Sequence, residues 1–128
     1  MRRLVADASA LAAVVFQEAG WEDVAERLDG AAVFAPELLK LELASVAWKK
    51  ARNRPADAAT ILSALSIALD SRWNLNWHDV QPTDVVLVAH ATGLSVYDAT
   101  YLWLAGALGA DLVTLDVRLA AAGEALVT

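Results

Sequence analysis

The chain has 128 residues, of which 58% are hydrophobic and 20% charged, and its formal net charge is −6. This composition is typical of a folded globular chain rather than a disordered one, and the length suits one domain spanning residues 1–128. Because the chain has no cysteine, disulfides, thiolate zinc sites and cysteine nucleophiles are excluded, and a reducing, cytoplasmic location is expected. The acidic balance also argues against nucleic-acid binding through overall charge alone.

The N-terminal stretch MRRLVADASALAAVVF has the basic start and the apolar run of a signal peptide. Asp7 interrupts that run, so we interpret the stretch as a short strand followed by a helix. No uncharged apolar segment reaches the roughly 18 residues that a membrane span needs. We therefore expect neither secretion nor insertion into a membrane.

In the first half of the chain, short apolar runs alternate with segments of helical periodicity. A strand is predicted at 3–6 and a helix at 9–20, for which Ser9 is a candidate N-cap and Gly20 a stop signal. The other elements predicted in this half are a short acidic helix at 21–30, a buried strand at 32–36 and a long amphipathic helix at 37–53.

The second half continues this alternation. Residues 73–80 alternate apolar and polar side chains, as a strand near the edge of a sheet does. The other predicted elements are helices at 56–71, 82–92, 95–109 and 117–126, a buried strand at 111–116 and a weak terminal strand at 126–128. Short buried strands between helices predict an α/β fold, with a mostly parallel sheet of four to five strands covered on both faces.

Four acidic residues occupy special positions in this predicted fold. Asp7 and Asp116 follow strands, at the edge where open parallel sheets bind their ligands. Asp98 lies three residues after Ser95, in the first turn of a helix. Glu42 shares a helical stripe with leucine and valine side chains, where an apolar residue is expected. The combination predicts that the four carboxylates meet in one site.

Each acid also has a purely structural explanation. Ser95 and Asp98 have the spacing of a helix-capping box, and Asp7 and Asp116 could cap the helices that follow them. Glu42 could reach solvent through a tilt of its helix. A shared site, by contrast, needs protons or cations because clustered carboxylates repel one another, and an all-oxygen set of ligands favours Mg²⁺ or Mn²⁺.

Four stretches of the sequence resemble a known family. VADASAL, LKLELASV, LSVYDATYLWLA and DLVTLD look like the PIN domain, specifically the VapC-like toxin ribonucleases, and their order and spacing match over essentially the whole chain. The resemblance implies a three-layer αβα sandwich that uses Mg²⁺ or Mn²⁺ to cut single-stranded RNA, with a cognate antitoxin as partner and homodimerisation. The acids implied as catalytic metal ligands are Asp7, Glu42, Asp98 and Asp116, and the supporting hydroxyl residues are Ser9 and Thr114.

Half of the basic residues fall in one short part of the chain, which includes the segment KKARNR at 49–54. Lys49, Lys50, Arg52 and Arg54 are candidates for phosphate contacts, because the acidic site itself would repel RNA. The alternative is a solvated helix end, where the helix dipole favours cations.

The remaining aromatic and histidine residues are expected to be structural. His78 and His90 lie outside the motifs and are not expected to bind a metal. Residues expected to pack in the core are Trp48, Tyr97, Tyr101 and Trp103, and those expected to be partly exposed at an interface are Trp21, Trp73 and Trp77.

Two other functional classes were compared with the endoribonuclease. A receiver-type signalling domain also carries carboxylates at strand ends, but its site needs a lysine late in the chain, and the last lysine here is Lys50. A catalytically silent PIN-like binding or scaffold protein has no reason to keep charges on an apolar stripe. The sequence therefore favours the metal-dependent endoribonuclease.

Overall fold

Four parallel strands form the central sheet in the computed structural model, which describes residues 1–70 and 74–127. The strands are β1 (Arg3–Ala6), β2 (Ala32–Pro36), β3 (Asn76–His78) and β4 (Asp111–Val113). Their order across the sheet is β3-β2-β1-β4, with Leu4 of β1 opposite Val33 of β2 and Val5 opposite Leu112 of β4. The predicted α/β fold is confirmed, with all four described strands parallel.

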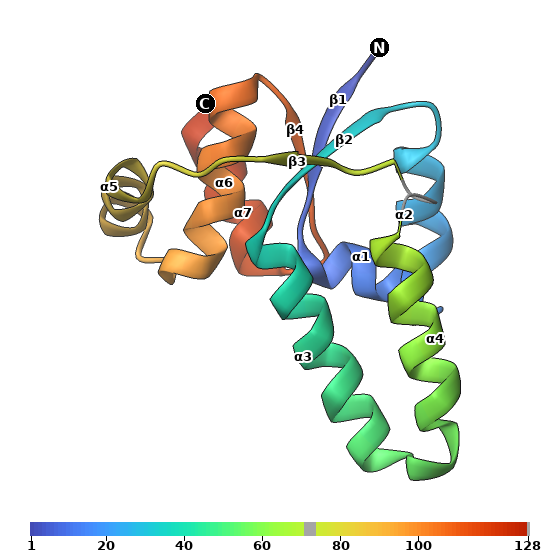
Figure 1. Ribbon diagram of the computed structural model, residues 1–128. Helices are drawn as coiled ribbons and strands as arrows, with labels where there is room; N and C mark the ends of the chain where they lie inside the picture. The colour runs from blue at the N-terminus through green and yellow to red at the C-terminus, as the bar shows by residue number, and fades with distance from the viewer. Residues whose placement is uncertain (71–73, 128) are drawn as a thin grey trace.

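Helices lie on both sides of this sheet, so the layers are helix, sheet and helix (Figure 1). On one side α6 packs on β1, β2 and β4, with α5 and α7 beside it; on the other side lie α1, α2 and the hairpin of α3 and α4. The helices of the described residues are α1 (Ala8–Val15), α2 (Trp21–Leu28), α3 (Leu38–Asn53), the 3-10 turn η1 (Pro55–Asp57), α4 (Ala58–Leu69), α5 (Pro82–Thr92), α6 (Val96–Leu108) and α7 (Val117–Val127).

The core forms where the middle of the sheet meets these two layers. Leu4 and Val5 of β1 are at most 1% exposed, although they point to opposite faces. A strand covered on both faces buries the side chains on both of them, which explains the continuous apolar run that follows the exposed Arg3. Leu11 of α1, Leu39 of α3 and Leu104 of α6 complete the same core cluster.

The first helix is shorter than predicted, and its cap is a different residue. It begins at Ala8 and ends at Val15, and Asp7 rather than Ser9 is the N-cap, since the Asp7 side chain accepts a hydrogen bond from the backbone N–H of Ala10. Gly20 has φ +88° and precedes α2 instead of ending the first helix. The chain therefore turns between Phe16 and Gly20, where a continuous helix was expected.

The predicted strands near the end of the chain also need correction. β3 has only three residues, although it lies at the edge of the sheet as predicted, and Trp73 lies outside the described residues. β4 ends at Val113, three residues before Asp116, because the chain turns there to enter α7. The weak strand predicted at 126–128 is wrong at residues 126 and 127, which belong to α7, and residue 128 lies outside the described residues.

Trp48 was expected in the core and is instead 59% exposed. The hairpin of α3 and α4 runs away from the sheet (Figure 1), so only one face of α3 has a partner to pack against. Leu41, seven residues earlier on α3, is 73% exposed for the same reason. Trp103, by contrast, is partly buried against the core, as predicted.

No single helix in the described parts of the chain is long and apolar enough to cross a membrane. α5 and α6 taken together have the length and composition, but they meet at an angle of 106°, and α6 packs on the sheet.

Candidate active site

The strand order reverses between β1 and β4. The chain passes from β1 to β2 to β3 in one direction, and β4 then joins the other side of β1. In open parallel sheets, ligands bind at such a switch point, beyond the carboxyl ends of the strands. Asp7 directly follows β1, and Asp116 follows β4 by three residues. The topology therefore brings these two carboxylates to the edge where a ligand site is expected.

Asp7 is buried and held by hydrogen bonds on both carboxylate oxygens. Its Oδ1 accepts from Ser9 Oγ at 2.7 Å and from the Ala10 backbone N–H at 3.0 Å, while its Oδ2 accepts from Thr114 Oγ1 at 2.6 Å. Ser9 Oγ and Thr114 Oγ1 lie 3.2 Å apart. Because each hydroxyl has a single proton, the two cannot also hydrogen-bond to each other when both donate to Asp7. The two hydroxyl residues thus fix the orientation of this carboxylate.

Asp116 is tied to the same network through Thr114. Its backbone N–H donates to Thr114 Oγ1 at 3.0 Å, and its own Oδ1 accepts from the backbone N–H of Leu119 in the first turn of α7. The capping roles considered for Asp7 and Asp116 are therefore real. They do not exclude metal binding, because an ionised carboxylate offers about four lone-pair sites.

Glu42 approaches the site from α3 and is bound by a buried tyrosine. Tyr101 is 1% exposed, and its hydroxyl donates to Glu42 Oε1. Glu42 itself is half-buried, and burial is the main cause that raises its pKa, with the carboxylates of Asp98 and Asp7 adding to the rise. The hydrogen bond from Tyr101 acts in the opposite direction. Glu42 thus points into the protein and does not escape to solvent.

Asp98 lies in the first turn of α6 and completes the group. Ser95 is the N-cap of this helix, with its Oγ accepting from the Asp98 backbone N–H at 3.1 Å. Burial raises the pKa of the Asp98 carboxyl first, and the charges of Asp116 and Asp7 raise it further, whereas Arg118 lowers it.

The charge effects on Glu42 and Asp98 show that each of these two acids lies close enough to two others of the predicted four to interact electrostatically. They come from four segments of the chain: the end of β1, α3, the start of α6 and the segment after β4. Neighbouring carboxylates that raise the pKa of Glu42 and Asp98 create a region where a cation would be stabilised strongly. The structure therefore brings the predicted group together at one edge of the sheet.

A hard divalent cation fits this donor set chemically, since all four groups are carboxylates with hydroxyl neighbours. No metal cluster is preformed, however: within residues 1–70 and 74–127, no three His, Asp or Glu side chains are arranged to hold an ion.

Comparisons with known proteins agree with this geometry. The sequence matches the family model of the PIN domain over residues 4–125. The chain belongs to the PIN domain family. It is 35% identical to Ribonuclease VapC3 of Pyrobaculum aerophilum, with 98% of each chain covered. The crystal structure of PAE2754 from the same organism is similar with a TM-score of 0.75 and 30% identity, over 94% of this chain and 86% of that one.

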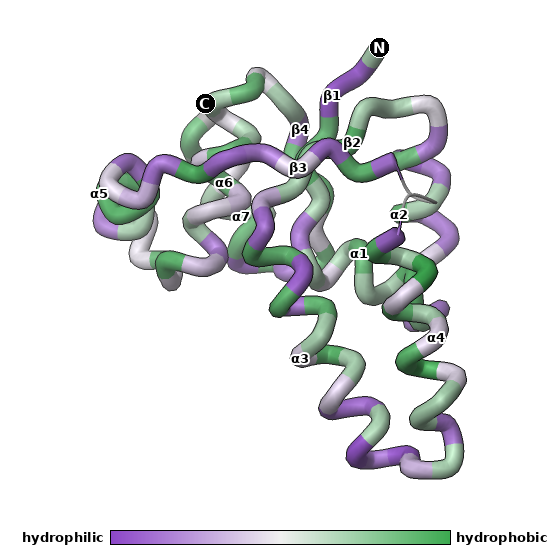
Figure 2. The backbone as a smooth tube through the Cα atoms, viewed as in Figure 1, coloured by the Kyte–Doolittle hydropathy of each residue, from purple (hydrophilic) through white to green (hydrophobic). Residues whose placement is uncertain are grey.

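The basic segment of this PIN domain lies at the far end of α3 from Glu42. With a rise of 1.5 Å per residue, Lys49 is about 10 Å and Arg54 about 18 Å farther along the helix direction. Figure 2 shows hydrophilic residues at this end of the α3–α4 hairpin, away from the sheet. If the segment contacts RNA as predicted, the contact therefore lies at a distance from the carboxylates, not at them.

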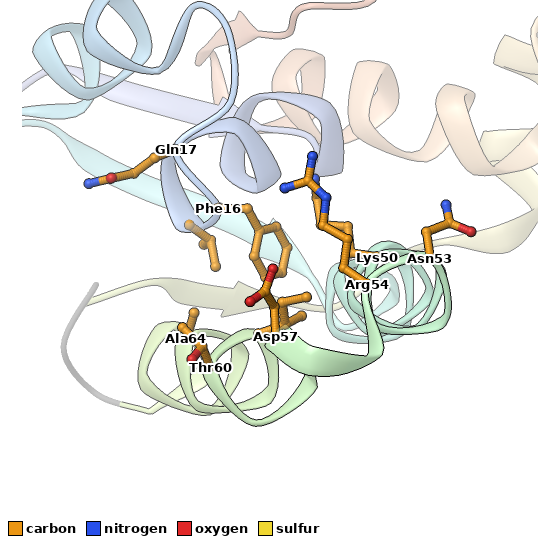
Figure 3. Close-up of a pocket in the computed structure, with 10 residues that line it drawn as sticks. Phe16, Gln17, Lys50, Asn53, Arg54, Asp57, Thr60 and Ala64 are labelled. Atoms are coloured by element: carbon orange, nitrogen blue, oxygen red, sulfur yellow. The ribbon is translucent and has the colours of Figure 1, made fainter.

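Two residues of the segment already have partners within the protein. Lys50 pairs with Glu18 and lies 5.6 Å from the centre of the Phe16 ring, and Arg52 lies 4.4 Å from the ring of Trp48. Lys50 also lines, together with Arg54, a pocket of about 490 Å³ between the end of α1 and the α3–α4 hairpin (Figure 3). The exposed Lys49 and Arg54 therefore test the RNA-contact hypothesis with the least disturbance of the fold.

Replacing both Lys49 and Arg54 by glutamate is expected to weaken RNA binding and to reduce the slope of log affinity against log salt by about one for each lost phosphate contact. Thermal unfolding should change little, because both side chains are exposed. The matched control replaces Arg2 and Arg27 by glutamate. These residues lie near the amino end of β1, and the control changes the net charge equally. An equal loss of affinity in both variants would assign the effect to overall charge.

Two tyrosines of α6 differ from the sequence-based expectation. Tyr101 was assigned to packing, yet its hydroxyl contacts a carboxylate of the site. Tyr97 was also assigned to packing, yet it is 61% exposed. The sequence spacing could have indicated that Tyr101 lies near the site, because Tyr101 follows Asp98 by three residues and so shares its face of the helix.

Proposed function

We propose that this PIN domain is a metal-dependent endoribonuclease that cleaves single-stranded regions of RNA and acts as the toxin of a toxin–antitoxin pair. The observation that carries the proposal is the meeting of Asp7, Glu42, Asp98 and Asp116 at the switch point of the sheet. Family membership and the similarity to a protein named as a VapC ribonuclease support the reaction class. The alternative of a receiver-type signalling domain is inconsistent with membership of the PIN domain family.

In this proposal Asp7 and Asp116 are the principal ligands of Mg²⁺ or Mn²⁺, and Asp98 and Glu42 complete the set directly or through water. When bound, such a cation acts as a Lewis acid toward the phosphodiester and lowers the pKa of the attacking water. The chain itself supplies orientation: Ser9 and Thr114 hold Asp7, and Tyr101 holds Glu42. Groups that orient metal ligands in this way affect both metal affinity and activity.

The partners follow from the same proposal. RNA is the substrate, a cognate antitoxin protein covers the site, and two copies of the chain form a homodimer in the cytoplasm. The family match over residues 4–125 supports a single nuclease domain that comprises residues 1–128. Purification together with the product of a neighbouring reading frame, followed by light scattering of the isolated chain, would test the antitoxin and the dimer separately.

Purified protein is expected to cut single-stranded RNA with Mg²⁺ or Mn²⁺ and to stop in EDTA, because clustered carboxylates repel a phosphodiester anion unless a cation lies between them. Added Mn²⁺ should also raise the melting temperature, since a ligand that binds the native state stabilises it. Asp116→Asn, purified in the same way, controls for contaminating nuclease. Equal cutting in EDTA would contradict the metal mechanism, and Mn²⁺ stabilisation without any cutting would favour a silent binding protein.

A further inference from the structure

We propose that an apolar pocket beside Asp98 receives one base of the RNA substrate, with Tyr97 as its stacking surface. The inference rests on the proposed function and adds to it a base-binding subsite next to the scissile bond.

The pocket lies between the segments that carry two of the four acids. Its volume is about 380 Å³, and it is bounded by the start of α3, the segment between β3 and α5, and the start of α6. Most of its lining is apolar, including Leu38, Val80, Val85, Val96 and Tyr97. This combination of size and apolar lining is that of a site for a small, flat organic group.

The sequence positions of the lining place this pocket next to the carboxylates. Val96 and Tyr97 directly precede Asp98 on α6, and Leu38 lies one turn before Glu42 on α3. In this proposal a base held here places its own sugar and phosphate toward the two acids. The pocket can therefore position a phosphodiester for attack without contacting it.

Tyr97 is suited to stacking because its ring is available. It is 61% exposed although it stands at the start of a core helix, and its neighbour Val96 is 48% exposed. Aromatic side chains stack on any base, since every base has a π-face. The hydroxyl of Thr100, another lining residue, already donates to the backbone oxygen of Val96 at 2.8 Å. The side of the pocket formed by α6 therefore favours stacking over hydrogen-bonded recognition, and we expect the subsite to accept several bases.

The charges at the rim favour a base over a phosphate. Glu37, His78 and Asp79 are the titratable residues of the lining, and the two carboxylates among them repel a phosphate anion. A base is neutral and meets no such repulsion. Lys40 pairs with Glu37 at 2.6 Å and lies 4.5 Å from the ring of Trp77, so a cation is nearby for the backbone of the bound strand.

The test uses the full chain with Mn²⁺ and a short single-stranded RNA whose cut site has been mapped, together with copies of it that each lack one base. In the parent protein, the loss of the base next to the scissile bond should raise KM by roughly 5- to 150-fold, the equivalent of one lost base–aromatic stack. Tyr97→Ala should raise KM for the intact RNA by a similar factor, with a smaller effect on kcat. In this variant, removal of the base next to the scissile bond should no longer raise KM further. Tyr97→Phe keeps the ring, so this variant should retain the rise in KM that the loss of that base causes in the parent.

Leu62→Ala is the matched control, because Leu62 is also a large exposed side chain, 55% exposed on α4, but lies outside the pocket. The proposed subsite would be overturned if Tyr97→Ala had the KM of the parent for the intact RNA and the same rise in KM for each RNA that lacks a base. A Tyr97→Ala variant that dissociates into smaller species while KM stays the same would also overturn it, since a second copy would then be the occupant of the pocket. A parent protein that cuts no RNA would contradict the proposed function itself, and the subsite with it.

Discussion

Asp98→Asn is expected to give a folded protein whose RNA cleavage falls by about 100-fold or more. The cap of α6 survives, because it uses Ser95 Oγ and the backbone N–H of residue 98, neither of which the substitution removes. The variant loses one charge of the metal-binding group, whereas the loss of a group that merely orients a ligand typically costs 10- to 100-fold. The stabilisation by added Mn²⁺ should shrink as well, and differential scanning fluorimetry measures it without reference to activity.

Asp84→Asn is the matched control for this substitution, because Asp84 also lies in the first turn of a helix, α5, but outside the site. It should leave cleavage and the response to Mn²⁺ unchanged. A variant at Asp98 that unfolds, or one that cuts RNA at nearly the parent rate, would show that Asp98 has a structural role only.

The parent protein and Asp98→Asn are also expected to differ in how their stability depends on pH. Burial, and then the charges of Asp116 and Asp7, raise the pKa of Asp98 above its ordinary value of 3.8 in the metal-free folded protein. The folded carboxyl holds its proton to a higher pH than the unfolded one, so its stabilising contribution is present at low pH and is lost as pH rises through the raised pKa. The amide introduced by Asp98→Asn does not titrate, so the variant does not lose this stability as pH rises. Urea unfolding in EDTA should therefore favour the variant increasingly as pH rises from about 4 to 7, and a constant difference would contradict the crowding of charges.

Tyr101→Phe is expected to reduce cleavage by about 10- to 100-fold, although the tyrosine is buried and does not reach the substrate. The substitution keeps the ring in the core and removes the hydroxyl that donates to Glu42 Oε1. Glu42 then loses the interaction that lowers its pKa, while burial and the neighbouring carboxylates continue to raise it. The free energy of unfolding should fall by about 1–3 kcal/mol, the usual cost of a buried acceptor left without its donor.

A double-mutant cycle with Glu42→Gln separates positioning from packing. If Tyr101 acts through Glu42, the two substitutions together should cost little more activity than Glu42→Gln alone. Tyr97→Phe removes a hydroxyl from an exposed tyrosine of the same helix and serves as the control. Full additivity of the two effects on activity would show that the hydroxyl of Tyr101 does not orient Glu42.

The sequence alone determined the order of the elements and the positions of the acids relative to them. Short runs such as LVA and AVFAP are continuously apolar, as in a strand covered on both faces, and the intervening segments have helical periodicity. Asp7 and Asp116 were assigned to the ligand-binding edge because both follow strands, and in a parallel sheet all the carboxyl ends lie at one edge. These assignments depend on local sequence patterns. They remain correct even where the predicted bounds of a helix or strand are wrong by two or three residues.

Only the tertiary structure decided which side chains touch. The hydrogen bond from Tyr101 to Glu42 joins residues 59 positions apart, and it exists because α3 and α6 meet at the site with these two faces inward. Trp48 belongs to a helix rich in apolar residues, yet it is exposed because α3 extends beyond the sheet that would have covered it. Periodicity states which residues share a face of a helix. Whether that face meets a partner depends on where the rest of the chain folds, and no local pattern contains that information.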